Sequence, residues 1–182
     1  MDSDERIIKL YLGGQKDLFE ILVKRHIDRV YNFAFRYVHD RGWAEDITQE
    51  TFLKVWKNLR RFDPEKNFKT WLFRIARNTA LDFLRKKKSV NFSELEEEDD
   101  KIFEPPDSGP MPQEIFERKE TEAKIAKILD ELSLKYRLVL ILYYQNQLNF
   151  REISEISGES VDTVKSRHRR AILLVRQKLS QA

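Results

Sequence analysis

The sequence predicts an all-α fold made of two small helical domains, and three features carry this prediction. Apolar residues recur at helical spacing through both halves of the chain, whereas no stretch shows the alternating pattern of a β-strand. Glycine and proline number only five each, so signals that interrupt helices are few. A segment rich in acidic residues and proline separates the two helical halves, which indicates two domains joined by a linker.

The first half, residues 1–92, is predicted to be a series of helices. One helical face runs from Leu18 to Tyr37, and a second helix covers 45–60, where early acidic residues suit the helix dipole. The apolar stripe of the second helix consists of Ile47, Phe52, Val55, Trp56 and Leu59. An Asp-Pro pair within 62–68 predicts a loop. In the helix after this loop, the side chains predicted to face the core are Trp71, Leu72, Ile75, Ala76, Thr79, Phe83 and Leu84.

Residues 93–115 are predicted to form an acidic, proline-containing linker. Six acidic residues lie between 94 and 100, and four prolines lie between 105 and 112. Repulsion among like charges and the fixed backbone of proline both oppose compact structure. A long surface loop within one domain is the alternative, but loops longer than about 12–15 residues are uncommon inside compact domains.

The second half, residues 116–182, is predicted to contain a helix-turn-helix. The apolar stretch 134–144 suits a buried central helix, and 150–157 forms the first helix of the motif. Gly158 can supply the positive φ that the turn requires, and Ser160 is a favourable N-cap for the next helix. The inward face of that helix is predicted to hold Val161, Val164, His168, Ala171, Ile172 and Val175. A packed, neutral imidazole is expected at the histidine of this face.

Charge is distributed unevenly along the chain. Residues 1–92 carry 20 basic and 13 acidic side chains, residues 93–122 carry 3 and 12, and residues 123–182 carry 11 and 6. Two basic blocks that flank an acidic segment indicate a polyanionic partner such as nucleic acid.

The outward face of the last helix is the first candidate for DNA contact. The N-terminal half of the second helix in such a motif lies in the major groove, where Arg and Lys pair with guanine edges or with phosphates. The candidate side chains are Thr163, Lys165, Ser166, Arg167, Arg169 and Arg170. A solvated cationic face on an ordinary helix is the alternative, and the turn and cap upstream favour DNA binding.

The second candidate is the segment 60–78, in which aromatic residues lie among cations. Phe62, Phe68, Trp71 and Phe73 are interspersed with six Arg and Lys residues. Aromatic faces stack on unpaired bases while cations hold the backbone, and loop residues can form a pocket for an extruded base. The alternative is that the aromatic residues are core, and for Trp71 and Phe73 this alternative is at least as well supported.

The helix at 45–60 has an outward face that is acidic and partly apolar. It carries Asp46, Gln49, Glu50, Leu53 and Lys57. Such a face in a basic domain suits a protein partner. Composition alone favours the plainer alternative, a solvated face whose acids serve the helix N-terminus.

No motif indicates an enzyme. The chain has no cysteine, its three histidines lack metal-ligand spacing, and it has neither a glycine-rich phosphate loop nor a nucleophile motif. We therefore expect no catalytic residue, no metal, no cofactor and no small-molecule substrate. Without an apolar run long enough to cross a membrane and without a signal peptide, a cytoplasmic protein with no direct membrane insertion is expected.

Two stretches resemble one protein family. Residues 44–87, AEDITQETFLKVWKNLRRFDPEKNFKTWLFRIARNTALDFLRKK, resemble region 2 of the bacterial extracytoplasmic-function (ECF) RNA polymerase sigma factors of the sigma-70 family. Residues 132–171, LSLKYRLVLILYYQNQLNFREISEISGESVDTVKSRHRRA, resemble region 4 of the same group. The two stretches occur in the family's order with nothing in place of region 3, and the resemblance covers nearly all of residues 5–180.

The resemblance implies a transcription initiation factor, a dissociable subunit that guides RNA polymerase to two promoter elements. It implies docking of the polymerase β′ clamp helices on Asp46, Gln49, Glu50 and Leu53, and a further contact with the β flap. It implies that the −10 element is bound as a melted strand by Phe62, Asn67, Phe68, Lys69, Trp71, Arg74, Arg77 and Asn78. It also implies that the helix from Thr163 reads the −35 duplex, with Arg151 on a phosphate.

The same resemblance implies a path for the linker and one further partner. The acidic linker would pass through the RNA exit channel of the polymerase, where it imitates the charge of nucleic acid. An anti-sigma factor, often membrane-bound in this family, would sequester the protein and hold it at the membrane.

Three features depart from the family's pattern. Ser157 and Glu159 flank the turn glycine where apolar residues are usual, Asp162 stands where a small residue is common, and His168 replaces an aliphatic residue. These departures bear on local packing and on promoter sequence.

The main alternative function is a stand-alone helix-turn-helix transcriptional regulator. Such a protein would need neither the 45–60 surface nor a single-strand site. The sequence contains no motif of a hydrolase or transferase. A purely protein-binding adaptor would not account for the two basic blocks.

Overall fold

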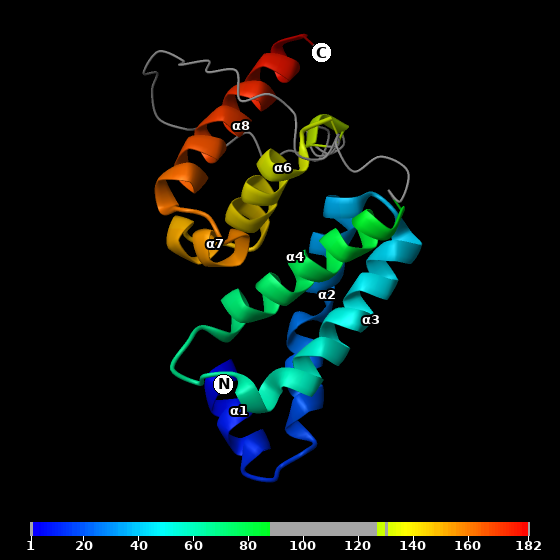
Figure 1. The fold of residues 1–182 in the computed structure, drawn as a ribbon, viewed down its shortest axis with the longest axis vertical. Helices are drawn as coiled ribbons and strands as arrows, with labels where there is room; N and C mark the ends of the chain where they lie inside the picture. Colours follow the sequence, from blue (N-terminus) through cyan, green and yellow to red (C-terminus); the bar gives the residue numbers. More distant parts are fainter. Residues whose placement is uncertain (1, 88–126, 130, 182) are drawn as a thin grey trace.

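The computed structural model describes residues 2–87, 127–129 and 131–181, and the predicted linker at 93–115 lies outside them. Within these described ranges every regular element is helical, which confirms the predicted fold class. The first group comprises α1 (Asp4–Leu12), α2 (Leu18–Val38), α3 (Arg41–Asn58), the 3-10 turn η1 (Leu59–Arg61) and α4 (Phe68–Lys87). The second comprises α6 (Leu134–Leu140), the π-helical turn η4 (Ile141–Gln145), α7 (Phe150–Ser157) and α8 (Val161–Gln181). Figure 1 draws the first group in blue to green and the second in yellow to red.

Helices α2, α3 and α4 form the body of the N-terminal domain, with α2 against α3 and α3 against α4 (Figure 1). Helix α1 packs on α2. Phe33 of α2 meets Phe73 of α4 edge-on, with ring centroids 5.5 Å apart, and both side chains are fully buried. Burial of one large apolar side chain contributes about 1.5–3 kcal/mol, so this pair fixes α2 against α4. Phe73 is therefore a core residue, which is one of the two places predicted for it.

Helix α3 turns small and medium-sized side chains inward: Ala44, Ile47, Thr48, Thr51 and Val55. The hydroxyls of Thr48 and Thr51 each donate to a backbone carbonyl four residues earlier, at 2.6 Å, so neither is unsatisfied. Trp56 was predicted on this stripe but is 52% exposed. The prediction is wrong because the nine residues from Ile47 to Trp56 make two and a half turns at about 3.6 residues per turn, which places the indole opposite Ile47.

In the C-terminal domain, α6 and α7 both pack on α8 (Figure 1). Leu140, Ala171 and Val175 are buried where α6 meets α8. The predicted buried central helix is present, and its last turn widens into η4. The carbonyl of Ile141 accepts from both the backbone and the side-chain nitrogen of Asn146, at 3.2 and 3.3 Å, and these two bonds close the wider turn.

The two domains pack on each other. Helix α4 contacts α7, and buried side chains of both domains form one continuous apolar cluster. Arg137 of α6 is buried, and its guanidinium donates to the carbonyls of Leu129 at 2.9 Å and Leu132 at 3.0 Å. It also donates to the carbonyl of Tyr37, at 3.1 Å, in the last turn of α2. One side chain thus satisfies carbonyls in both domains and ties the end of α2 to the second domain.

Candidate nucleic-acid interface

Two caps and one glycine define the helix-turn-helix. Helix α7 begins with a capping box, in which the Asn149 side chain accepts from the Glu152 N–H at 3.0 Å and the Glu152 carboxylate accepts from the Asn149 N–H at 2.8 Å. The helix ends at Gly158, whose φ of 76° is left-handed. Ser160 then caps α8 by accepting from the Thr163 N–H at 3.1 Å. The predicted places of the turn glycine and the N-cap serine are confirmed.

The apolar face of α8 packs as predicted, and His168 belongs to it. The His168 side chain is 7% exposed. Its ring centroid lies 4.7 Å from that of Tyr143, 5.7 Å from that of Tyr144 and 5.1 Å from that of Phe150. Burial lowers the pKa of His168 to about 4, so the ring is neutral at neutral pH, as predicted. In the part of the chain that is described, no group pairs with its buried Nε2.

The opposite face of α8 presents most of the predicted cationic surface. The exposed members are Lys165, Ser166, Arg169 and, at the start of α7, Arg151. The half-buried members are Thr163 and Arg170. A helical turn spans 3.6 residues, so Lys165, Ser166 and Arg169 share one side of α8 and can reach one DNA groove together.

Arg167 differs from its neighbours on α8. Its guanidinium forms an ion pair with the carboxylate of Glu159, and the two side chains are 24% and 26% exposed. Glu159 directly follows the turn glycine, so the pair ties α8 to the turn. In this arrangement the guanidinium is engaged with the carboxylate, and the DNA contact of Arg167 stays a prediction. The ion pair also shows how the turn accommodates an acid where an apolar residue is usual.

Asp162 stands in the first turn of α8, next to the cationic surface. Its side chain is 96% exposed, and its carboxylate lies 4.0 Å from Lys165 Nζ. A pair this exposed adds little stability, although an acid in the first turn interacts well with the helix dipole. The carboxylate therefore reduces the positive potential at the end of α8 that is expected to enter DNA.

Four residues predicted to bind a single strand share one side of α4. Asn67, just before the helix, and Trp71, Arg74 and Asn78 within it recur every three or four residues, which is the helical repeat. Asn67, Arg74 and Asn78 are exposed, and Trp71 is half-buried. Arg77 lies beside this stripe and donates from Nη1 to Asn78 Oδ1 at 3.1 Å. The arrangement is a short polar and aromatic track along the helix.

The two phenylalanines predicted to contact bases lie in the core. Phe62 is 5% exposed and Phe68 is fully buried. Their rings meet edge-on at 5.6 Å, and each ring also packs against Trp71. A buried ring presents no face to a base, which corrects the predicted direct role of both residues. In this arrangement they support the half-exposed indole of Trp71 from the core side.

Lys69 faces the second domain. Its ammonium donates to the backbone carbonyl of Asn146, and the side chain is half-buried. Burial lowers the pKa of Lys69, the nearby charge of Arg29 lowers it further, and Glu152 acts in the opposite direction. This predicted −10 residue is therefore part of the contact between the domains.

The predicted docking face lies on α3, away from the core. Asp46, Gln49 and Leu53 are exposed, and Glu50 is half-buried with its carboxylate 3.8 Å from Lys54 Nζ. Leu53 is 48% exposed. A large apolar side chain that is held in solvent among polar neighbours is typical of protein interfaces.

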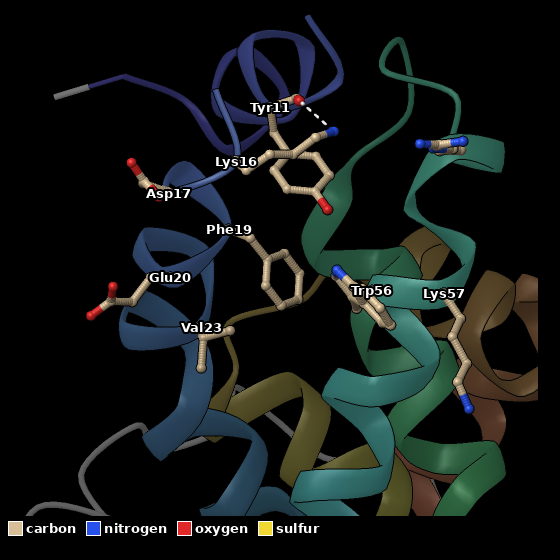
Figure 2. Close-up of a pocket in the computed structure, with 9 residues that line it drawn as sticks. Tyr11, Lys16, Asp17, Phe19, Glu20, Val23, Trp56 and Lys57 are labelled. Carbon is tan, nitrogen blue, oxygen red and sulfur yellow. Dashed lines mark hydrogen bonds between the residues drawn. The ribbon is translucent and has the colours of Figure 1, made fainter. Parts of the chain in front are cut away.

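An apolar groove continues from this face across α3 toward α2. Its volume is about 550 Å³, and its lining comprises Phe19, Val23, Ile27, Thr48, Gln49, Phe52, Leu53 and Trp56. A neighbouring hollow of about 930 Å³ shares Phe19, Val23 and Trp56 and reaches α1. Figure 2 shows Phe19 and Trp56 pointing toward each other across this hollow, with Tyr11 and Lys16 at the same opening. The exposed indole of Trp56 lines this groove beside the docking face.

Two other kinds of feature are absent from the described residues. Among them, no three His, Cys, Asp or Glu side chains gather so that they could hold a metal ion. None of the helices in these ranges is long and apolar enough to cross a membrane.

Sequence reasoning missed two residues that organise these surfaces. Glu5 accepts a hydrogen bond from the Phe68 N–H at 3.0 Å, and no local pattern signals a contact between residues so far apart. Arg137 did carry a signal, because it is one of two cations in the apolar stretch 134–144 and directly precedes its uninterrupted apolar run. A cation in such a stretch is stable only when its donors are satisfied, as the three carbonyl acceptors of Arg137 satisfy them.

Comparison with known proteins gives two family matches, one for each domain. Residues 22–90 match Sigma-70 region 2, and residues 122–174 match Sigma-70, region 4. The ECF RNA polymerase sigma factor SigW of Bacillus subtilis is 33% identical over 176 residues, which cover 94% of this chain and 94% of that protein. The ECF RNA polymerase sigma factor SigE of Mycolicibacterium smegmatis is 32% identical over 160 residues, which cover 88% of this chain but only 61% of that protein.

Two solved structures share the fold across both domains. CnrH, solved in complex with the cytosolic domain of CnrY, has a TM-score of 0.73 at 25% identity, and the match covers 99% of each chain. The sigma factor RpoE, solved in complex with the anti-sigma factor NepR from Bartonella quintana, has a TM-score of 0.68 at 25% identity and covers 90% of this chain.

Proposed function

Because this chain belongs to the extracytoplasmic-function group of the sigma-70 family, whose members bind RNA polymerase and direct it to promoters, we propose that its surfaces divide that task. The face of α8 reads the −35 duplex, the track on α4 binds the melted −10 strand, and α3 docks on the polymerase. The observation that carries the proposal is that one chain presents all three surfaces. A stand-alone DNA-binding regulator would need only the first.

The −35 surface works by presenting side chains of a packed helix to the major groove. Lys165 and Arg169 are exposed and can pair with guanine edges or phosphates, and the Ser166 hydroxyl can reach a phosphate oxygen. Arg151 at the start of α7 would hold the flanking phosphate. The caps at both helices and the buried ring cluster around His168 support this proposal, because they fix the position of α8 within its domain.

The −10 surface combines a stacking ring with backbone-binding cations. Trp71 offers a half-exposed indole, Arg74 offers an exposed guanidinium, and the amides of Asn67 and Asn78 can bond base edges. Base faces for stacking and the Watson–Crick edges of bases become accessible only after the duplex opens, so the surface suits a melted strand.

Polymerase binding is assigned to the exposed side chains of α3. Asp46, Gln49 and Leu53 combine charge, an amide and an apolar group on one face, and the adjoining groove can take further apolar side chains of a partner. We take that partner to be the clamp helices of β′, with the β flap contacting the second domain. The linker would follow the RNA exit channel between these two sites.

Promoter binding would change the contact between the domains. The Lys69 ammonium is bound to the Asn146 carbonyl and is not available to DNA in this arrangement. The proposal therefore requires α4 and α7 to separate before the whole −10 surface engages. An anti-sigma factor that binds the closed arrangement would oppose this step. RpoE was solved with an anti-sigma factor, and CnrH was solved with the cytosolic domain of CnrY. We propose that this chain has an anti-sigma partner. The chain would act in the cytoplasm when released, and a membrane-bound partner would hold it at the membrane.

The test of the docking face is a triple variant, Asp46→Ala with Gln49→Ala and Leu53→Ala. We expect its affinity for sigma-free core polymerase to fall by about tenfold or more, because removal of a central apolar residue and its polar neighbours typically costs over 1 kcal/mol. Fluorescence anisotropy of the labelled protein with core polymerase measures this affinity. A triple variant that is folded and binds core as tightly as wild type would exclude this face.

The matched control is the double variant Lys165→Ala with Arg169→Ala. Both side chains lie on α8, so the variant should bind core polymerase normally and yet lose initiation at promoters. Its affinity for the −35 duplex should fall, and the dependence of that affinity on salt should become shallower for each phosphate contact that is lost.

A further inference from the structure

Helix α1 contacts the start of α4, although it precedes the residues that match Sigma-70 region 2. The family match begins at residue 22, whereas α1 covers Asp4–Leu12. The Glu5 carboxylate of α1 accepts a hydrogen bond from the Phe68 N–H at 3.0 Å. Phe68 is the first residue of α4, so a side chain from one end of the domain caps the helix that carries the −10 surface.

The cap from Glu5 complements a local one. The Asn67 side chain accepts from the Thr70 N–H at 2.9 Å, which leaves the earlier N–H of Phe68 without a partner inside the helix. Glu5 satisfies that donor and also places a negative charge at the positive end of the helix dipole. The beginning of α4 is therefore defined from two sides, once by its own sequence and once by α1.

Helix α1 is itself firmly anchored next to this point. The Asp4 carboxylate lies 2.6 Å from Arg25 Nη1 and 2.6 Å from His26 Nε2, and His26 is 3% exposed. Burial raises the pKa of Asp4, but hydrogen bonds and charge from His26 and Arg25 outweigh burial and hold it below its ordinary value. The His26 ring packs edge-on against Phe68, with centroids 5.6 Å apart. The residue next to Glu5 is thus fixed to α2 and, through His26, to the start of α4.

A second link joins α1 to the loop before α4. Lys9 Nζ lies 3.1 Å from a carboxylate oxygen of Glu65, and both side chains are largely exposed. An exposed ion pair contributes little to stability. Lys9 lies on the same side of α1 as Glu5, one helical turn later. The Lys9–Glu65 ion pair and the Glu5 hydrogen bond therefore both connect α1 to the segment 62–68.

We propose that α1 is a positioning element for the −10 surface and that Glu5 is its positioning residue. Glu5 holds the first turn of α4 so that Asn67, Trp71 and Arg74 meet the melted strand in one arrangement. The inference rests on the proposed function, since it concerns the same surface. It adds a residue that lies outside the Sigma-70 region 2 match and need not touch DNA.

The experiment compares Glu5→Ala, Glu5→Gln and the control Asp28→Ala. Glutamine keeps an oxygen that can accept from Phe68 N–H, whereas alanine leaves none. Asp28 is an exposed acid on α2 and controls for the loss of one negative charge. Each full-length protein is assembled with core polymerase at a temperature where it is folded. The probes are the non-template −10 oligonucleotide and the −35 duplex of a promoter that the wild-type holoenzyme uses, and the same oligonucleotide with each base replaced.

We expect Glu5→Ala to bind the −10 oligonucleotide about fivefold more weakly and to discriminate less between the original and the base-replaced probes, with −35 duplex affinity unchanged. Glu5→Gln should recover most of the loss, and Asp28→Ala should match wild type. Amide exchange at Phe68 should be faster in Glu5→Ala. A purely structural role would lower thermal stability without changing the ratio of −10 to −35 affinity.

The outcomes separate the two proposals. If the wild-type holoenzyme uses no promoter at all, the proposed function fails and takes this inference with it. If the wild type uses promoters but Glu5→Ala binds and discriminates −10 probes as wild type does, only the positioning role is overturned. Failure of glutamine to rescue would also overturn it, because the hydrogen-bond acceptor would not be what matters.

Discussion

His168 is a titratable side chain inside a cluster of rings from Tyr143, Tyr144 and Phe150. An imidazolium there would lose hydration, so burial lowers the pKa of His168 to about 4. In the unfolded chain the ring keeps its ordinary pKa of 6.5. Between these values the unfolded state binds more protons than the folded state, and the fold therefore loses stability as pH falls through this window.

The corresponding prediction concerns the slope of stability against pH. We expect the free energy of unfolding of the wild type to decrease as pH falls from 6.5 toward 4, and His168→Leu to remove this part of the decrease. Leucine cannot take up a proton, and an aliphatic side chain suits the apolar face of α8. Urea unfolding of both proteins at neutral pH and at about pH 5 measures the effect. The same pH dependence in both proteins would refute it.

Prediction from sequence at the residue scale succeeded where the neighbours along the helix decide the environment. His168 was placed correctly because the apolar repeat of α8 surrounds it. Phe62 and Phe68 were not, because an aromatic residue among cations gives the same pattern whether it stacks on a base or on Trp71. Trp56 was misplaced although the helical repeat sets it opposite Ile47, because its apolar character was given more weight than its position.

At the scale of the element, the turn between α7 and α8 depends on the backbone of Gly158. Its φ of 76° is unfavourable for residues with a Cβ, although an added Cβ would meet nothing within 4 Å. The cost of a substitution therefore comes from backbone conformation and not from a clash.

We expect Gly158→Ala to lower the free energy of unfolding by about 1 kcal/mol, and Gly158→Asn to lower it less, because asparagine tolerates the left-handed region better. Both changes should weaken −35 duplex binding in the same order, since the turn sets the angle between α7 and α8. Denaturant unfolding and duplex binding of the two variants test this ordering. Alanine equal to glycine, or asparagine no better than alanine, would count against it.

The helix-turn-helix was predictable because its signals are local: a glycine, a serine cap and an apolar repeat within some thirty residues. The role of α1 was not, because the Glu5 carboxylate and the Phe68 N–H are 63 residues apart in sequence. An acid in the first turn of a helix is explained well enough by its own helix dipole, so Glu5 carries no second signal.

At the scale of the whole molecule, the packing of the two domains is the main feature that the sequence did not reveal. Arg137 joins the domains through the Tyr37 carbonyl, a contact across 100 residues, and Lys69 joins them through the Asn146 carbonyl. Apolar periodicity shows which face of a helix is buried but not what buries it. From the sequence, the side of α4 that packs on α7 therefore could not be told apart from a side buried inside the N-terminal domain.

This closed arrangement sets the requirement for function. The exposed residues of α8 and α3 are accessible in it, whereas Lys69 is engaged between the domains. We expect polymerase to dock on α3 and promoter DNA to bind α8 while the domains are still packed together. The −10 surface would be complete only after the domains separate. We therefore expect specific initiation to need both the polymerase and this chain.

The most direct test adds the protein to sigma-free core polymerase on genomic DNA and sequences the 5′ ends of the transcripts. We expect a defined set of new start sites, each preceded by two recurring sequence elements at a constant spacing. These starts should be absent with core polymerase alone and with the triple variant of α3. No new starts, together with footprints of the protein alone on duplex DNA, would contradict the account and favour a stand-alone regulator.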